Sequence, residues 1–199
     1  MTDCVALSFD DGPSQWTAPI LEILAAHSAR ATFFLVGLSL QQHPQLVERI
    51  QHEGHELGNH TWSHPSLARE CDDARVRLEL QRTSDALERL VGRRPALYRA
   101  PRYERDARID AVAAELGLRH ARGDVIPPDW HPGASARLIA AMAVQGAQPG
   151  AVIGLHDGVP PQEAAEAVTR QATVDALALI LPRLAERGLT CVPVSELDG

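Results

Sequence analysis

Two adjacent carboxylates stand at the end of a short apolar run near the start of the chain. The segment VALSFDDGPS, residues 5–14, places Asp10 and Asp11 directly after residues typical of a core strand and directly before a glycine and a proline. Like charges side by side repel each other, so such a pair needs a positive partner or a metal ion. Further along the chain, the segment HTWSH places His60 and His64 four positions apart. In a helix or a turn, these two imidazoles face the same way.

These residue types form a ligand set for a metal ion. Two neutral imidazoles and one carboxylate, with a coordination position left for water, make a catalytic site of the zinc type. We therefore expect Asp11 to bind a divalent ion together with His60 and His64. A bound metal ion lowers the pKa of its water toward neutrality, and Asp10 is placed to take the proton of that water.

Apolar runs of strand length alternate with segments of helical periodicity along the whole chain. The expected strands are residues 5–9, 31–37, 55–60, 96–99, 118–125, 151–156 and 189–194. The expected helices are residues 18–28, 43–54, 72–91, 106–116, 134–145 and 171–187. This alternation predicts a parallel sheet with crossover helices, and both an open doubly wound sheet and a closed barrel fit it.

The polar residues favour the barrel. Five of the expected strands have polar residues at their C-terminal ends. In chain order these are Asp10 and Asp11, Asn59 and His60, Arg99, Asp124, and His156. Side chains from many strand ends meet most readily on the C-terminal rim of a barrel. We predict one α/β domain over residues 1–199, folded as a barrel, with its site on that rim.

Composition excludes several classes of function. The 199 residues carry a formal net charge of −7 without a long basic run, so we expect no nucleic-acid partner. All 19 basic residues are arginine, which excludes lysine nucleophiles, Schiff bases and a phosphate loop built on lysine. The three cysteines lie far apart in sequence, and we expect them to be small residues that are buried at least in part.

The ends and the hydropathy of the chain bear on its location. No run reaches the roughly 18 apolar residues of a membrane span. No signal segment precedes residue 5, which predicts a cytoplasmic protein, although an exported parent without its leader would have the same sequence.

The motifs also resemble those of a known family. In order, SFDDGP (8–13), HTWSH (60–64), RAPRY (99–103), DVIPPDW (124–130) and GLHD (154–157) are similar to the five motifs of the polysaccharide deacetylase family, which shares the NodB homology domain of carbohydrate esterase family 4. The segments ATFFLVG and GHELGNHTWSH also resemble it, so the similarity spans nearly the whole chain. The resemblance implies a distorted (β/α)7 barrel and metal-dependent hydrolysis of an N-acetyl group on an amino sugar.

The resemblance also implies roles for individual residues. It makes Asp10 the general base, with Arg99 paired to it. It makes Asp11, His60 and His64 the ligands of one divalent ion, with Zn²⁺ favoured and Co²⁺ or Ni²⁺ as alternatives.

The resemblance also makes His156 the general acid that protonates the leaving amine. Leu155 and Trp130 would form the walls of a small pocket for the acetyl methyl group.

Two motifs depart from the family pattern. The third usually ends in an aromatic residue and a glycine, with a backbone N–H there that helps to hold the oxyanion, and here Arg102 and Tyr103 occupy these places. We expect both to contact the substrate, and the long Arg102 side chain either to alter the groove or to bind an anionic substrate. In the fourth motif, Ile126 stands where an aspartate is usual, so Asp124 or Asp129 would orient His156 instead.

The expected substrate is therefore an N-acetylated amino sugar in a chitooligosaccharide, peptidoglycan or a related saccharide. One alternative is the same chemistry on another amide, such as an N-formyl sugar or a small cyclic amide. A third is a saccharide-binding module without turnover, which the retained base, ligands, arginine and acid argue against. For residues 158–170, a short helix that narrows the groove and a loop that points into solvent both remain open.

Overall fold

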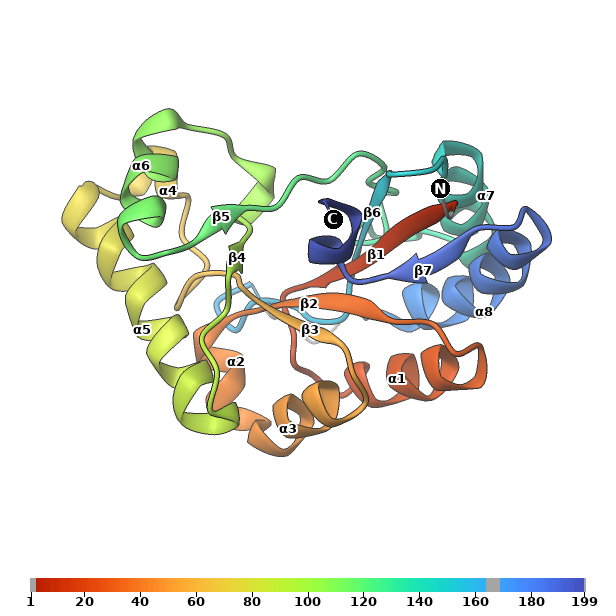
Figure 1. The fold of residues 1–199 in the computed structure, drawn as a ribbon, viewed down its shortest axis with the longest axis horizontal. Coiled ribbons are helices and arrows are strands. Elements are labelled where there is room, and N and C mark those ends of the chain that lie inside the picture. The colour runs from red at the N-terminus through yellow and green to blue at the C-terminus, as the bar shows by residue number, and fades with distance from the viewer. Residues whose placement is uncertain (1–2, 164–168, 199) are drawn as a thin grey trace.

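The computed structural model describes residues 3–163 and 169–198 as a curled parallel sheet with helices on its outer face (Figure 1). The strands are β1 (Cys4–Asp10), β2 (Ala31–Leu35), β3 (Glu56–Asn59), β4 (Leu97–Tyr98), β5 (Arg119–His120), β6 (Val152–His156) and β7 (Thr190–Val192). The α-helices are α1 (Thr17–Ala26), α2 (Gly37–Gln42), α3 (Pro44–His52), α4 (Leu67–Glu70), α5 (Asp73–Val91), α6 (Ala107–Glu115), α7 (Ala136–Gly146) and α8 (Gln171–Glu186). Two 3₁₀ turns, η1 (Pro101–Tyr103) and η2 (Val194–Asp198), complete the described elements.

The strands run in the order β5-β4-β3-β2-β1-β6, and β7 pairs with the beginning of β1. Every pair is parallel. The segment after β5 then comes round to β6 through a bridge between Val125 and Ile153. The sheet is therefore a distorted barrel of seven parallel strands, which confirms the predicted fold class.

Strand β1 shows how the sequence positions the site. Its odd-numbered residues Val5, Leu7 and Phe9 belong to the main core between the sheet and the helices. The alternate residues point to the other face, because successive side chains of a strand alternate. Ala6 accordingly packs inside the curl against Phe34 and Val194. Ser8 and Asp10 lie on this same inner face, so the strand ends with a carboxylate that points into the barrel.

The two ends of the barrel differ. The C-terminal turn η2 lies in the middle of the curl in Figure 1 and closes the end at which the strands begin. Its Val194 is buried, and the Val194 backbone N–H donates to the Thr32 hydroxyl at 2.8 Å. The carboxyl ends of the strands, which carry the motif residues, form the opposite end.

The expected elements are confirmed, with differences at their ends. Strands β4 and β5 have two residues each, shorter than the expected 96–99 and 118–125. Helix α2 was not predicted, because the apolar run 31–37 was assigned wholly to a strand. The chain turns at Gly37, where a Cβ atom would lie 2.2 Å from the Trp62 ring, so a larger residue has no room at this turn.

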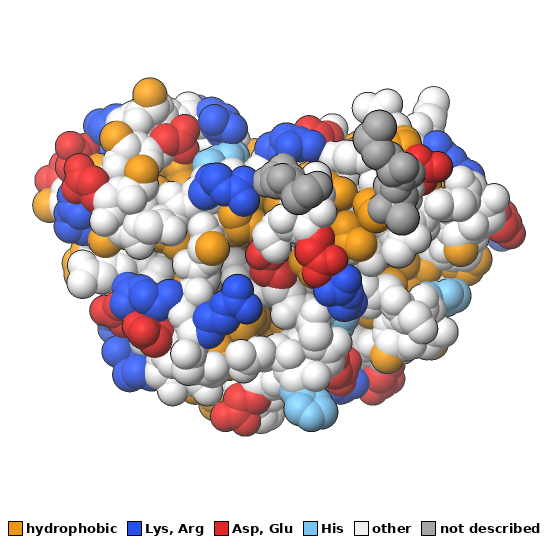
Figure 2. All heavy atoms as spheres, viewed as in Figure 1, with side chains coloured by type: hydrophobic (Ala, Val, Ile, Leu, Met, Phe, Trp, Pro, Cys, Tyr) orange, Lys and Arg blue, Asp and Glu red, His pale blue; other side chains and the backbone are white. Residues whose placement is uncertain are grey.

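None of the described helices is both long enough and apolar enough to cross a bilayer. On the face shown in Figure 2, acidic and basic side chains are interspersed rather than gathered into one basic patch. Cys71 and Cys191 are buried and Cys4 is half-buried, and all three are free thiols, as expected.

Candidate active site

Asp10 is held at the barrel centre by a buried arginine. Arg99, which is 0 % exposed, donates from one guanidinium nitrogen to Asp10 Oδ1 and to Ser8 Oγ, both at 2.8 Å. Its other nitrogens donate to the carbonyl oxygens of Ala121 and Arg122, at 3.4 and 2.7 Å. A buried charge is tolerated when it is paired and hydrogen-bonded in this way. Asp10 and Arg99 thus form a buried ion pair inside the barrel.

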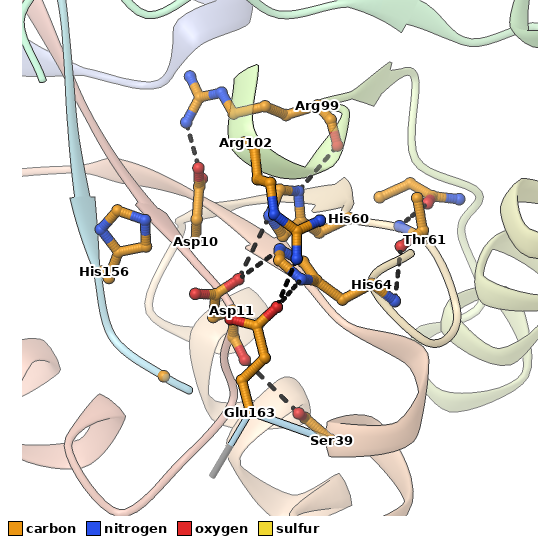
Figure 3. Close-up of polar contacts among 12 residues, drawn as sticks. Asp10, Asp11, Ser39, His60, Thr61, His64, Arg99, Arg102, His156 and Glu163 are labelled. Carbon is orange, nitrogen blue, oxygen red and sulfur yellow. Dashed lines mark hydrogen bonds and ion pairs between the residues drawn. The ribbon is translucent and has the colours of Figure 1, made fainter. Parts of the chain in front are cut away.

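Asp11 turns away from Asp10 because its backbone is left-handed, with φ = 75°. Its Oδ1 lies 3.3 Å from His60 Nε2 and 3.2 Å from His64 Nε2 (Figure 3). All three side chains are buried, and their ligand atoms lie within 4.8 Å of one another. Asp11 Oδ1 makes no hydrogen bond with any residue in the described part of the chain. A buried carboxylate oxygen between two imidazole nitrogens fits a divalent cation.

The two imidazoles are presented by a turn rather than by a helix. His60 follows β3, and its Nδ1 donates to the Arg99 carbonyl oxygen at 2.8 Å, which leaves Nε2 to face Asp11. Thr61 and His64 have left-handed backbones, with φ of 68° and 56°. The Thr61 hydroxyl accepts from the His64 N–H at 3.0 Å and closes the turn. Left-handed residues other than glycine persist where their surroundings determine them, often at functional sites.

Helix α5 holds this turn through a buried carboxylate that the sequence analysis missed. Glu79, 2 % exposed, accepts from the backbone N–H groups of Trp62 and Ser63, at 2.9 and 2.7 Å. On the strand side, Asn59 accepts from the Thr61 N–H at 2.8 Å and donates to the Leu80 carbonyl oxygen at 2.7 Å. A glutamate on the buried face of an amphipathic helix was the available signal, because such a carboxylate needs a partner inside the protein.

The protonation states suit metal binding. Burial alone would raise the pKa of Asp11, but its close contact with the His60 imidazole and the nearby His156 and His64 together hold this pKa below its usual range. Burial, assisted by His60, lowers the pKa of His64 to about 4. At neutral pH the site therefore offers a carboxylate and a neutral His64 imidazole, the forms that ligate a metal ion.

His156 lies across the site from the two ligand histidines, beside Asp10 in Figure 3. Asp129 lies with Oδ1 2.7 Å from His156 Nδ1, and its Oδ2 accepts from the His156 backbone N–H at 2.8 Å. The Thr173 hydroxyl donates to the same carboxylate at 2.8 Å. Burial opposes the charged form, yet Asp129, with help from Asp11 and Asp10, raises the pKa of His156 to about 9. His156 is therefore an imidazolium at neutral pH.

Of the two aspartates considered as partners of His156, the structure places Asp129 there. Asp124 instead binds Arg122 at 2.9 Å and accepts from the Val152 N–H at 2.9 Å. Val152 begins β6 and His156 ends it, so Asp124 lies at the other end of the strand. The Asp124 alternative is wrong, because the chain after β5 pairs with β6 before it reaches the rim.

Leu155 does not line a pocket beside the site. It is 0 % exposed and belongs to the core between the sheet and the helices. It pairs in register with Phe9, whereas Gly154 and His156 face the interior. This expectation was wrong because the strand alternation assigns Leu155 to the outer face. Trp130 does border the site: it is 46 % exposed, and its ring centroid lies 5.3 Å from that of His156.

Arg102 and the described part of the segment after β6 lie over Asp11, His60 and His64, the candidate metal-binding triad (Figure 3). Arg102 donates to Glu163 Oε1 at 2.7 Å, and the same oxygen lies 3.4 Å from His64 Nδ1. Gln162 donates to the Ser63 carbonyl oxygen. Of the rim segment 158–170, residues 158–163 thus reach over the site, and residues 164–168 lie outside the described residues.

Tyr103 does not offer its backbone to a substrate. Its N–H donates to the Ala100 carbonyl oxygen at 3.2 Å, and its side chain enters the barrel, where the ring lies 5.0 Å from the Arg99 guanidinium carbon. A Cβ atom at Gly154 would lie 2.1 Å from the Tyr103 hydroxyl oxygen. Tyr103 therefore occupies the inner side of β6, beside Gly154.

Asp157, the last residue of the GLHD motif, is a buried carboxylate to which the sequence assigned no role. It is 0 % exposed, and its Oδ2 accepts from the Thr17 hydroxyl at 2.5 Å. Burial, followed by the charges of Asp11 and Asp10, raises its pKa to about 7. A Cβ atom at Gly12 would lie 2.2 Å from Asp157 Oδ2, so the glycine after the paired carboxylates gives room to this third one.

The fold and the site define a class: a parallel α/β barrel with a buried carboxylate–histidine cluster that could hold a metal ion, a second carboxylate and a protonated histidine on its rim. A model of the family described as "Polysaccharide deacetylase" matches residues 2–121. The chain belongs to the polysaccharide deacetylase family and is a hydrolase of the deacetylase type.

Individual relatives agree over the whole length. The chain is 37% identical over 202 residues to a chitooligosaccharide deacetylase of Bradyrhizobium sp. (strain ANU 289), covering 98% of this chain and 91% of the relative. It is similar to the crystal structure of a peptidoglycan N-acetylglucosamine deacetylase in complex with 4-naphthalen-1-yl-N-oxidanyl-benzamide, with a TM-score of 0.89 and 35% identity over 98% of this chain and 88% of that one. A family 4 acetyl xylan esterase from Clostridium thermocellum, in complex with a cobalt ion, has a TM-score of 0.86 and 31% identity over 98% of this chain and 89% of that one.

The triad predicts a specific dependence of metal uptake on its two histidines. His60→Ala and His64→Ala should each abolish stoichiometric zinc uptake, because one carboxylate and one imidazole hold the ion far less tightly than three ligands. Zinc content after dialysis, measured by plasma mass spectrometry, checks this. The exposed His27→Ala variant is the matched control and should keep the wild-type content. Full zinc content in the His60 and His64 variants would contradict the assignment.

Proposed function

We propose that this chain hydrolyses the N-acetyl group of N-acetylglucosamine units in a saccharide, with one divalent metal ion bound by Asp11, His60 and His64. The observation that carries the proposal is the convergence of three separate groups on one end of the barrel: the triad, the Asp10–Arg99 pair and the His156–Asp129 pair. Similarity to deacetylases named for chitooligosaccharides and for peptidoglycan N-acetylglucosamine supports the substrate class.

Zn²⁺ is the proposed ion, because two imidazoles and a carboxylate with an open position are its typical catalytic ligands. Co²⁺ accepts the same donors, and a similar structure holds cobalt. A divalent ion bound there supplies an acidified water and an electrophile for the amide carbonyl oxygen. The remaining chemistry falls to the side chains around the triad.

Asp10 is the proposed general base. Arg99 holds its Oδ1 at 2.8 Å and fixes the orientation of the carboxylate. Asp10 ends β1 on its inner face at the rim and directly precedes Asp11, the carboxylate of the triad. Asp10 would accept a proton from a water held at the triad while the oxygen of that water attacks the amide carbon.

His156 is the proposed general acid. An amine leaves a tetrahedral carbon readily only when its nitrogen is protonated. Asp129 occupies Nδ1 of His156, at 2.7 Å, so the proton on Nε2 is the one available to the leaving nitrogen. With its pKa raised to about 9, His156 holds this proton at neutral pH.

The substrate would contact exposed residues around this centre. The Trp130 ring, which borders His156, offers an apolar face to the acetyl group or the sugar. Arg102, with its side chain 50% exposed, offers a cation at the mouth. The N-formyl sugar and the small cyclic amide remain alternative substrates, and a silent saccharide-binding module remains the third possibility.

Product analysis tests the proposal. The zinc-loaded chain should release acetate from N-acetylated chitooligosaccharides or peptidoglycan fragments, with one free amine for each acetate. Asp10→Asn should keep its zinc and lose about a hundredfold or more in kcat, because an amide does not accept the proton. Asp124→Asn removes an aspartate at the other end of β6 and should keep the wild-type kcat.

The other outcomes identify the rivals. Formate from an N-formylated sugar without acetate from the acetylated one would replace the proposal with the deformylase. Saccharide binding without any product would replace it with the silent module. Wild-type kcat in Asp10→Asn would remove Asp10 from the mechanism.

The His156–Asp129 pair predicts the alkaline limb of the pH profile. A general acid works in its protonated form, so kcat is retained below the pKa of His156 and falls as the pH rises through about 9. Asp129→Asn removes the main cause that raises this pKa, so the limb should move to lower pH. Steady-state rates between pH 6 and 10 check this, with Asp124→Asn as the control. An alkaline limb at the same pH in Asp129→Asn would contradict the assignment.

A further inference from the structure

Tyr103 enters the barrel from a strained turn. Arg102 and Tyr103 are consecutive residues of η1 with left-handed backbones, with φ of 58° and 54°. A left-handed backbone is unfavourable for a residue other than glycine, because its Cβ atom comes too close to the following carbonyl oxygen. The strain directs the Tyr103 ring inward while the Arg102 side chain stays at the mouth. Such a turn persists where the position of the side chain compensates for the strain.

Two glycines form a slot for the Tyr103 ring. A Cβ atom at Gly123 would lie 2.5 Å from Tyr103 Cε1, and one at Gly154 would lie 2.1 Å from the hydroxyl oxygen. Neither glycine has a left-handed backbone, so what glycine supplies at both positions is room. The Arg99 guanidinium carbon lies 5.0 Å from the ring centroid and 4.1 Å from the Phe34 ring. Tyr103 therefore also contacts the arginine that holds Asp10.

The hydroxyl of Tyr103 lies at the floor of the site. It adjoins Gly154, which pairs with Ser8, and the next inward pair toward the rim is His156 with Asp10. The hydroxyl is buried and has no hydrogen-bond partner among the described residues. Burial raises the pKa of Tyr103, and the charge of Asp10 raises it further, so the phenol stays protonated and is a donor.

An unpartnered buried hydroxyl is costly. A donor left unsatisfied on burial keeps the full cost of its lost hydration, which a phenylalanine at the same place would avoid. Three features coincide at Tyr103. Its turn is strained, two glycines make room for its ring, and its hydroxyl is an unsatisfied donor below the Asp10 carboxylate. Structural packing alone explains the ring and leaves the hydroxyl unexplained.

We propose that Tyr103 is a positioning residue for the reaction, whose phenol O–H donates a hydrogen bond to the Asp10 carboxylate when the substrate is bound. The inference rests on the proposed function, in which Asp10 is the general base. Arg99 and Tyr103 then hold the carboxylate from two directions and leave its other lone pairs free to accept from the attacking water. The phenol itself transfers no proton, and hydrogen bonds of catalytic groups that are long in a free enzyme commonly tighten in the substrate complex.

Removing the hydroxyl tests this role. Tyr103→Phe should lower kcat about tenfold or more, because hydrogen bonds to charged groups contribute about 1.5–3 kcal/mol. KM and zinc content should stay at their wild-type values, and Tm should not fall, since no hydrogen bond of the free enzyme is lost. The matched control is Tyr98→Phe at the other tyrosine of the chain. The Tyr98 hydroxyl donates to Asp110, away from the site. That variant should lower Tm and keep kcat.

Two results would overturn the inference. Wild-type kcat in Tyr103→Phe would show that the hydroxyl does not act on the reaction. A fall in Tm equal to that of Tyr98→Phe, with kcat unchanged, would show that its role is structural. These outcomes differ from a failure of the proposed function, in which the wild-type chain itself releases no acetate.

A second variant tests the slot without any assay of activity. Gly154→Ala brings a Cβ atom to 2.1 Å from the Tyr103 hydroxyl oxygen but to 3.1 Å from Cζ. The substitution should therefore lower Tm more in the wild-type background than in Tyr103→Phe, where the oxygen is gone. Equal falls in the two backgrounds would show that the hydroxyl does not occupy the slot, and the inference would fail.

Discussion

The structure depends on how it neutralises two adjacent carboxylates at the end of one buried strand. Asp10 and Asp11 are both almost completely buried, where unpaired charges are strongly unfavourable. The left-handed backbone at Asp11 separates them. Asp10 then faces the Arg99 guanidinium inside the barrel, and Asp11 faces the two imidazoles. The two carboxylates therefore avoid their mutual repulsion by facing different partners, although they are adjacent in sequence.

This division requires rigid surroundings, and much of the fold supplies them. The turn that carries His60 and His64 is fixed from below by Glu79 of α5, a carboxylate that accepts three hydrogen bonds from that turn. Across the site, Asp129 holds His156 by both its ring and its backbone. Positioned donors and charges of this kind act on a reaction without reorganising first, which is why they contribute strongly to catalysis.

Sequence periodicity and strand-end chemistry predicted the seven strands, the barrel and the grouping of Asp11 with its two histidines, because these depend on local pattern and on the common rim of a parallel sheet. They did not predict which side chains turn inward where the chain departs from the regular pattern. The pocket wall that the family resemblance implied for Leu155 was wrong, because the register of β6 places this side chain on the outer face of the sheet. Asp124 was misplaced because the chain after β5 pairs with β6 before the rim. The inward ring of Tyr103 follows from a left-handed turn that residue types alone do not indicate.

The central claim is that Asp11 ligates the metal while Asp10 stays paired with Arg99. A crystal structure of the zinc-loaded chain, with anomalous scattering recorded at the zinc edge, tests it most directly. The account predicts one peak about 2.0–2.2 Å from an oxygen of Asp11 and from Nε2 of His60 and His64, typical distances for such ligands, with the Asp10–Arg99 ion pair intact. A peak ligated by Asp10, with Arg99 released, or a peak away from the two histidines would contradict it.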